Sequence, residues 1–328
     1  ETLMGERHHA LASLLLLASS AGCRVDATVG YNEGALSGGK ACETDALARC
    51  QDGACAVTDL FDAPHGAVTL QADDTDLFFL PSQLSLAKRP IAGGAVTELA
   101  AATTPIMRLT SDATHVYWIE QGGKVRGVPK AGGALFEASY VFGNPSDVTL
   151  DASHLYWVLP DLGQVAMATK PMGQSTHISG ENWPTAITTD GGYVYWVNAG
   201  NLPGTGELRR AKRGDLKTRE LLLSELDAPL AITAAAGDVY WASKTSVFKL
   251  ADGETSPQTL ANDLMEIQQL GVAGEALYGV SMDGFWTIPV VGGKRTTLHP
   301  RPMSALAVAC SGVFASHWLE DGLERYGR

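Results

Sequence analysis

The side chains best suited to acid–base chemistry in this sequence are histidines, and two of them stand in nearly identical strings. His115 lies in DATHVYW and His154 lies in DASHLYW. An imidazole titrates near neutral pH, which makes it a common general acid or base. The corresponding place in three other strings holds Asp76, Tyr193 and Asp238. The pattern therefore favours a structural turn position over catalysis.

Other kinds of catalysis and phosphate binding have motifs that this sequence lacks. It contains no HExxH, GxSxG, Walker-type or GxGxxG pattern, and these place metal ligands, nucleophiles or phosphate-binding loops. The 36 acidic against 24 basic residues give a formal net charge of -12, which argues against phosphate-backbone binding as the main role. The hydrophobic fraction of 45% and charged fraction of 18% exclude intrinsic disorder. We expect no cofactor, no metal site and no nucleic-acid partner.

Aromatic triplets divide most of the chain into one repeated unit. The triplets are centred on Phe78, Tyr117, Tyr156, Tyr195, Tyr240, Tyr278 and Phe314. Their centres are 39, 39, 39, 45, 38 and 36 residues apart. An aspartate precedes each of the first four centres by five residues: Asp73, Asp112, Asp151 and Asp190. The regular spacing indicates seven copies of one structural element.

Each copy contains four short segments with the composition of β-strands. The third copy reads SDVTLD, SHLYWVL, GQVAMATKP and STHISG. These segments are rich in β-branched and aromatic residues and are bounded by turn-forming residues. The aspartates fall in the turn between the first two strands, where a carboxylate bonds the backbone two residues on. Four strands every 39 residues or so are typical of a β-propeller. We predict an all-β, seven-bladed propeller of four-stranded antiparallel blades, with six blades as the alternative.

The last copy is incomplete, which suggests how the ring closes. It offers strands at 305–308, 313–318 and 323–326 before the chain stops. The segment AVTDLFDAP at 56–64 resembles AVTELA, the outer strand of the next copy, at 95–100. We therefore expect an N-terminal strand to complete the last blade, which removes an open sheet edge.

Four cysteines besides Cys23 suggest two disulfides, provided that the compartment is oxidising. Closure of the ring would bring Cys55 near Cys310 and leave Cys42 and Cys50 as a local pair. A zinc site is the alternative, but the usual CxxC spacing is missing.

The N-terminus has the composition of an export signal. Residues 9–21 read HALASLLLLASSA and are uncharged and Leu-rich. This run is too short to span a bilayer, which needs about 20 residues. Its length and composition suit the apolar region of a signal peptide. The small residues before Cys23 resemble the lipobox of bacterial lipoproteins, which implies that Cys23 becomes a lipid-carrying N-terminus. The alternative is a plain secretory signal.

We therefore divide the chain into a signal peptide at 1–22, a lipidated cysteine with a flexible tether and a cysteine-containing lead-in at 23–54, and a propeller at 55–328. The expected location is lipid-anchored in the outer membrane or periplasm, with secretion as the alternative.

The Tyr-Trp strings resemble the YWTD-type propeller repeat, and the arrangement is similar to uncharacterised bacterial lipoprotein propellers with Tyr-Trp repeats. The resemblance covers residues 56–328. The Thr-Asp that follows Tyr-Trp in that repeat is missing, because the copies read YWIE, YWVL, YWVN and YWAS. The resemblance implies the fold and a role as a binding platform, and it assigns no ligand-binding Asp.

Candidate contact residues lie in the loops that lead into the inner strands, because such loops carry function on rigid scaffolds. Trp183 falls outside the register of the repeat tryptophans at 118, 157 and 196, and an insertion at 198–206 lengthens the same copy. We predict binding by Trp183, Asn182, Asn201 and Arg301. The alternative is that Trp183 fills a gap between blades.

Two further groups of charged residues bear on function. The expected inner strands contribute only Arg108 and Asp147 as charged groups, which is too few for a metal site. A basic cluster in the fourth copy indicates solvated outer strands: Arg209, Arg210, Lys212, Arg213, Lys217 and Arg219.

The function expected from the sequence is a non-enzymatic, envelope-anchored binding or scaffold propeller. Its ligand would be a protein or a glycan, and we expect a monomer. The alternative is an extracytoplasmic propeller enzyme of lyase or lactonase type, with its site at the mouth of the central channel.

Overall fold

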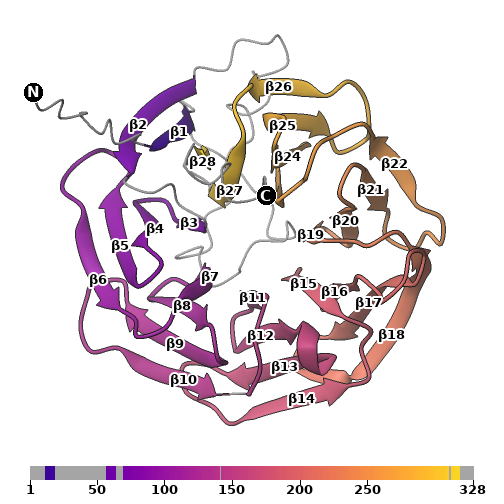
Figure 1. Ribbon diagram of the computed structural model, residues 1–328, viewed down its shortest axis with the longest axis horizontal. Coiled ribbons are helices and arrows are strands. Elements are labelled where there is room, and N and C mark those ends of the chain that lie inside the picture. The colour runs from indigo at the N-terminus through magenta and orange to yellow at the C-terminus, as the bar shows by residue number, and fades with distance from the viewer. Residues whose placement is uncertain (1–11, 19–56, 64–68, 141, 310–311, 318–328) are drawn as a thin grey trace, which may run out of the picture.

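The computed structural model describes residues 12–18, 57–63, 69–140, 142–309 and 312–317. This part of the chain is all-β apart from one short 3-10 helix, η3 (Pro160–Leu162). Its strands form antiparallel sheets that stand side by side around a common centre (Figure 1). The chain is therefore a β-propeller, as the repeat predicts.

Six sheets each contain four consecutive strands. The first three are β3 (Leu70–Ala72), β4 (Asp76–Ser82), β5 (Ser85–Pro90) and β6 (Thr97–Ala101); β7 (Ile106–Ser111), β8 (His115–Glu120), β9 (Lys124–Pro129) and β10 (Phe136–Tyr140); and β11 (Asp147–Leu150), β12 (His154–Leu159), β13 (Gln164–Thr169) and β14 (Ser175–Ser179). The next three are β15 (Pro184–Thr189), β16 (Tyr193–Asn198), β17 (Gly206–Lys212) and β18 (Asp215–Leu226); β19 (Ala231–Ala235), β20 (Asp238–Ala242), β21 (Val247–Leu250) and β22 (Gln258–Ala261); and β23 (Gln269–Ala273), β24 (Ala276–Ser281), β25 (Gly284–Pro289) and β26 (Thr296–His299).

The last copy of the repeat departs from the prediction of seven equal blades. Its own residues supply only β27 (Met303–Ala309) and β28 (Gly312–His317) to a sheet of the described chain. That sheet continues with β1 (Ala12–Ala18) and then β2 (Val57–Ala63). The propeller thus has six complete blades, the number given as the alternative, and a seventh sheet with two strands of its own. The expected third strand at 323–326 lies outside the described residues.

The position of β1 was not predicted, because its residues lie inside the expected signal peptide. β1 pairs antiparallel with β28, where Leu16 lies opposite Phe314, and with β2, where Leu14 lies opposite Phe61. The expected outer segment at 56–64 corresponds to β2, which is outermost in this sheet.

The second strand of each blade supplies the core, because it is covered by neighbouring blades on both faces. Trp118, Trp157 and Trp196 are fully buried together with the tyrosines that precede them. An aromatic side chain of this size buries roughly 150–250 Å², or roughly 4–6 kcal/mol of gross transfer free energy. The repeated triplets therefore define the strands by packing.

The sixth blade reads LYG instead of VYW, and the structure explains the difference. Trp286 on β25 lies opposite Gly279 on β24, and its ring occupies the space that a Cβ at Gly279 would need. The blade keeps its buried tryptophan but takes it from the neighbouring strand.

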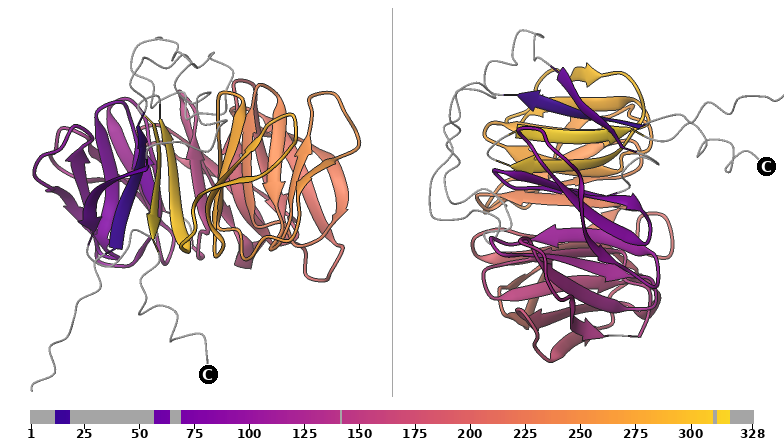
Figure 2. Two further views of the ribbon diagram at one scale, coloured as in Figure 1. Left: turned by 90° about the horizontal axis from the view of Figure 1, so that it is seen from above. Right: turned by 90° about the vertical axis from the view of Figure 1, so that its left-hand side faces the viewer.

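The strands run between two edges of the ring, as the side views in Figure 2 show. We call one edge the loop rim, because its loops lead from the outer strand of one blade into the inner strand of the next. The opposite edge, the turn rim, carries the turns between the first and second strands. The inner strands thus begin at the loop rim and end at the turn rim.

The turn rim contains the four repeated aspartates in the predicted role. Oδ1 of Asp73, Asp112, Asp151 and Asp190 accepts the backbone N–H two residues on, at 2.7–2.9 Å. The backbone N–H groups of His115 and His154 bond the same turns, so both histidines hold the predicted turn position.

The second oxygen of these aspartates connects blades. Lys130 Nζ of the second blade donates to Asp73 at 2.7 Å, and Lys170 Nζ of the third blade donates to Asp112 at 2.9 Å. Burial alone would raise the pKa of Asp73 and Asp112, but the lysines and the backbone N–H groups hold both pKa values below the usual range. The turn rim is therefore held together by ionised side chains.

Candidate functional site

The loop rim of the third and fourth blades is formed by four segments that hydrogen bonds join in a row. Asn144 N donates to Asp161 Oδ2 at 3.2 Å, and Glu181 N donates to the carbonyl of Gly163 at 3.0 Å. Gly200 N donates to the carbonyl of Asn182 at 3.0 Å. These bonds link the loops at 142–144, 160–163, 181–183 and 199–202 into one surface.

Each of the four segments contributes one exposed apolar side chain. Phe142 is 77% exposed, Leu202 is 68% exposed, and Leu162 and Trp183 are close to half exposed. We call Phe142, Leu162, Trp183 and Leu202 the apolar ridge. Since large apolar side chains gain free energy when they leave water, these four make the loop rim a candidate interaction site.

Trp183 has a backbone conformation that is unusual for its size. Its φ is 62°, in the left-handed region that bulky residues rarely adopt. Its side chain is 47% exposed, unlike the fully buried tryptophans of the repeat. Strain of this kind persists where the surroundings fix it, and it is concentrated at functional sites.

The segment that carries Trp183 is fixed at its base by Glu181. The Glu181 side chain is 1% exposed, and it accepts hydrogen bonds from Trp196 Nε1, Asn198 Nδ2 and Arg219 Nη1, each at 2.8 Å. Arg209 Nε lies 3.6 Å from Glu181 Oε2. A buried carboxylate with this many partners holds the backbone of the next two residues in place.

Three of the four predicted contact residues come together. Asn201 Nδ2 donates to Asn182 Oδ1 at 2.7 Å, beside Trp183. Arg301 lies on the same rim but in the loop between β26 and β27, three inner strands further round the ring. The structure does not bring Arg301 to the apolar ridge.

The predicted basic cluster is largely engaged with carboxylates. Arg209 donates to Glu207 at 2.8 Å, Arg210 donates to Glu220 at 2.6 Å, and Arg219 bonds Glu181. Two of its members thus support the loop of Trp183, whereas Lys212 and Lys217 are exposed.

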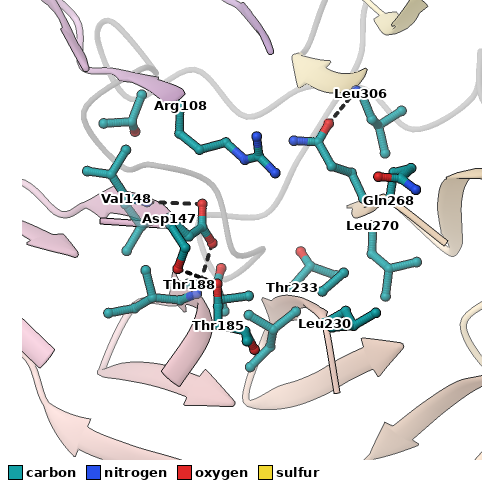
Figure 3. Close-up of a pocket in the computed structure, with 18 of the residues that line it drawn as sticks. Arg108, Asp147, Val148, Thr185, Thr188, Leu230, Thr233, Gln268, Leu270 and Leu306 are labelled. Carbon is teal, nitrogen blue, oxygen red and sulfur yellow. Dashed lines mark hydrogen bonds between the residues drawn. The ribbon is translucent and has the colours of Figure 1, made fainter. Parts of the chain in front are cut away.

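A second feature is a partly open cavity of about 190 Å³ lined by the inner strands and the loops that lead into them (Figure 3). Its lining includes Thr110, Thr233 and Gln268, and its charged members are Arg108 and Asp147, the two that the sequence places on inner strands. Burial raises the pKa of Asp147, and the charge of Arg108 opposes that rise.

The described residues contain neither a cluster of metal-ligating side chains nor a membrane-spanning helix. No group of three or more His, Cys, Asp or Glu side chains is placed to hold a metal ion. Within the same ranges, no helix combines the length and the apolar composition required to cross a bilayer. The sites predicted at Cys23, Cys42, Cys50, Cys55 and Cys310 lie outside the described residues.

Comparison with known proteins shows the fold alone. No protein-family model matches the chain, and no curated protein matches it. Many solved structures are similar, among them the crystal structure of a computationally designed protein, Ika8, with a TM-score of 0.56 and 12% sequence identity. The match covers 78% of this chain and 97% of the designed one.

Sequence reasoning missed three members of the apolar ridge and its support. Phe142, Leu162 and Leu202 are single apolar residues in polar loops, and each looks unremarkable alone. Glu181 directly precedes Asn182 and Trp183, and a lone acid before an off-register tryptophan was the available signal.

Proposed function

We propose that this chain is a non-enzymatic binding propeller that holds a protein partner on the apolar ridge of the loop rim. The observation that carries this proposal is the exposed Trp183, fixed in a left-handed conformation above a buried carboxylate. A side chain kept exposed at a cost in backbone strain needs a reason other than packing.

The composition of the ridge favours a protein over a glycan. Tryptophan and phenylalanine are enriched at protein interfaces, where a few aromatic anchors supply most of the binding free energy. Sugar binding would use the Asn182–Asn201 pair with Trp183, but Phe142, Leu162 and Leu202 offer no polar atoms for hydroxyl groups. The ridge therefore suits an apolar protein surface with polar groups opposite the two asparagines.

The test is a capture experiment on envelope extracts, followed by affinity measurement with the captured protein in purified form. We expect Trp183→Ala to lose the partner. Val291→Ala is the matched control, since Val291 is an exposed apolar residue on the turn rim, and it should retain the partner. Unchanged partners in Trp183→Ala would contradict the ridge assignment, and binding of purified glycan instead of protein would contradict the partner class.

We also infer that the chain reaches the envelope through an export signal and a lipid on Cys23. The support is the Leu-rich run followed by small residues before that cysteine. In cells fed a labelled fatty acid, the wild type should take up label and Cys23→Ser should not. Equal labelling of both would contradict the anchor.

We further propose that the ring closes as a seventh blade whose outermost strand is 57–63. If residues 1–22 are removed on export, the place of β1 becomes available to the expected strand at 323–326. In protein that begins at residue 23, the amides of β28 should remain protected from hydrogen exchange. Rapid exchange along 312–317 would contradict a closed seventh blade.

A further inference from the structure

In three of the seven copies, the residue nine positions before the aromatic centre has the same role at the central channel. Leu109 N donates to Thr69 Oγ1 at 3.2 Å, Ile187 N donates to Asp147 Oδ2 at 2.9 Å, and Leu306 N donates to Gln269 Oε1 at 2.6 Å. In each case the acceptor side chain bonds the backbone of the next inner strand. In these three copies the position connects neighbouring blades through an oxygen acceptor.

Arg108 occupies the same position in the second blade and cannot take this role. A guanidinium has five N–H donors and no acceptor. Its Nη1 donates to the carbonyl of Met107 at 3.0 Å, and no other hydrogen bond joins the guanidinium to the described residues. The remaining copies have Ala186, Ala231 and Ala305 here, so a long cation is not needed for packing.

Arg108 faces the same cavity as Asp147. Figure 3 shows the guanidinium extending from β7 into the cavity, with the Asp147 carboxylate on the adjacent inner strand β11. The carboxylate is held in place by Ile187 N and by Val148 N at 3.0 Å. Two opposite charges thus face one cavity from neighbouring strands.

We propose that Arg108 and Asp147 bind a small zwitterion, with its carboxylate on the guanidinium and its ammonium group on the Asp147 carboxylate. A simple anion would be repelled by Asp147 and a simple cation by Arg108, whereas a ligand with both charges is attracted by each. Hydrogen bonds between charged groups are the strongest that a protein forms, and planar guanidinium groups recognise carboxylates well.

The size and lining of the cavity limit the ligand further. A volume of about 190 Å³ is small for a ligand pocket and fits a single amino acid. Hydroxyl and amide groups from Thr110, Thr233 and Gln268 line the rest of the space. The ligand class is therefore a free amino acid with a small polar side chain.

The proposal is tested by isothermal titration of the full chain with L-serine, acetate and ethylammonium as probes. We expect L-serine to bind at least tenfold more tightly than either single-charge probe. Arg108→Gln should weaken L-serine binding at least tenfold. Lys244→Gln, which removes an exposed cation outside the cavity, should leave it unchanged.

A second variant separates the charge of Asp147 from its structural bond. Asp147→Asn keeps an oxygen that accepts the Ile187 N–H, and the thermal midpoint checks that the fold is retained. It should weaken L-serine binding and leave acetate binding unchanged or stronger. The proposal is overturned if the wild type binds L-serine and acetate with equal affinity. It is also overturned if L-serine does not bind at millimolar concentration, or if Arg108→Gln binds L-serine as tightly as the wild type does.

Discussion

The two rims of this propeller are built from the same repeat but differ in regularity. On the turn rim, equivalent aspartates make equivalent bonds in successive blades, and Lys130 and Lys170 join one blade to the one before. On the loop rim, the third and fourth blades carry an inserted loop, a left-handed tryptophan and a row of exposed apolar side chains. Repeated positions thus hold neighbouring blades together, whereas departures from the repeat mark the surface on which we propose binding.

The largest expected effect is at the base of the loop rim. Glu181→Ala removes a buried acceptor from Trp196, Asn198 and Arg219, and should lower the free energy of unfolding by about 4 kcal/mol. Urea denaturation measures this loss in the free energy of unfolding. Glu181→Gln is the control: it keeps an oxygen acceptor and should lose less. Equal losses in both variants would show that the charge alone matters, and no loss in either would contradict the anchoring role.

The next largest loss of stability is expected when one of the repeated aspartates of the turn rim is removed. Asp112→Ala removes the acceptor of the turn and leaves Lys170, whose side chain is 8% exposed, without its carboxylate. We expect a loss of about 3 kcal/mol in unfolding free energy, again by urea denaturation. Asp74→Ala is the matched control, because partial burial and the charge of the neighbouring Asp73 raise the pKa of this carboxyl. The removal of Asp74 should not lower the free energy of unfolding. A loss of unfolding free energy equal to that of Asp112→Ala would contradict the stabilising role of Asp112.

The turn rim also predicts a sensitivity to acid. The folded-state pKa values of Asp73 and Asp112 lie below the usual value, so their stabilising contribution is present above about pH 4 and is lost as pH falls through the folded values. The thermal midpoint should fall between about pH 5 and pH 2. In the double variant Asp73→Asn with Asp112→Asn the fall should be shallower, and an equally steep fall would place the acid sensitivity elsewhere.

The smallest effect on stability is expected at the tip of the loop rim. Trp183→Gly relieves a left-handed conformation that costs a large residue about 1 kcal/mol, and it removes a ring that is only half buried. The thermal midpoint should stay the same or rise slightly. Leu208→Gly, in the buried core of the same blade, should lower it strongly. A comparable drop in both variants would mean that Trp183 is a packing residue.

The repeat made the architecture predictable because each blade has the same burial requirements. The spacing of the aromatic centres, the turn aspartates and the inner-strand charges Arg108 and Asp147 were all read from local patterns. The blade count was less secure, because the last copy depends on strands from elsewhere in the chain. Its sheet takes Ala12–Ala18, a run that was assigned to export from its composition.

Contacts between copies of the repeat could not be predicted from the sequence. Lys170 meets Asp112 across 58 residues, and this depends on how far one blade is rotated from the next. The apolar ridge has the same origin, since Phe142, Leu162 and Leu202 come from three separate loops. Trp183 was found because it breaks the register, whereas Arg301 was chosen for its loop alone and lies elsewhere on the rim.

Hydroxyl-radical footprinting of the complex with the captured partner tests the central comparison most directly. Trp183 on the loop rim and Met172 on the turn rim are 47% and 64% exposed, so both should be oxidised in the free protein. The account predicts that the partner protects Trp183 and leaves the oxidation of Met172 unchanged. Protection of Met172 with continued oxidation of Trp183 would place the binding face on the turn rim and contradict the account.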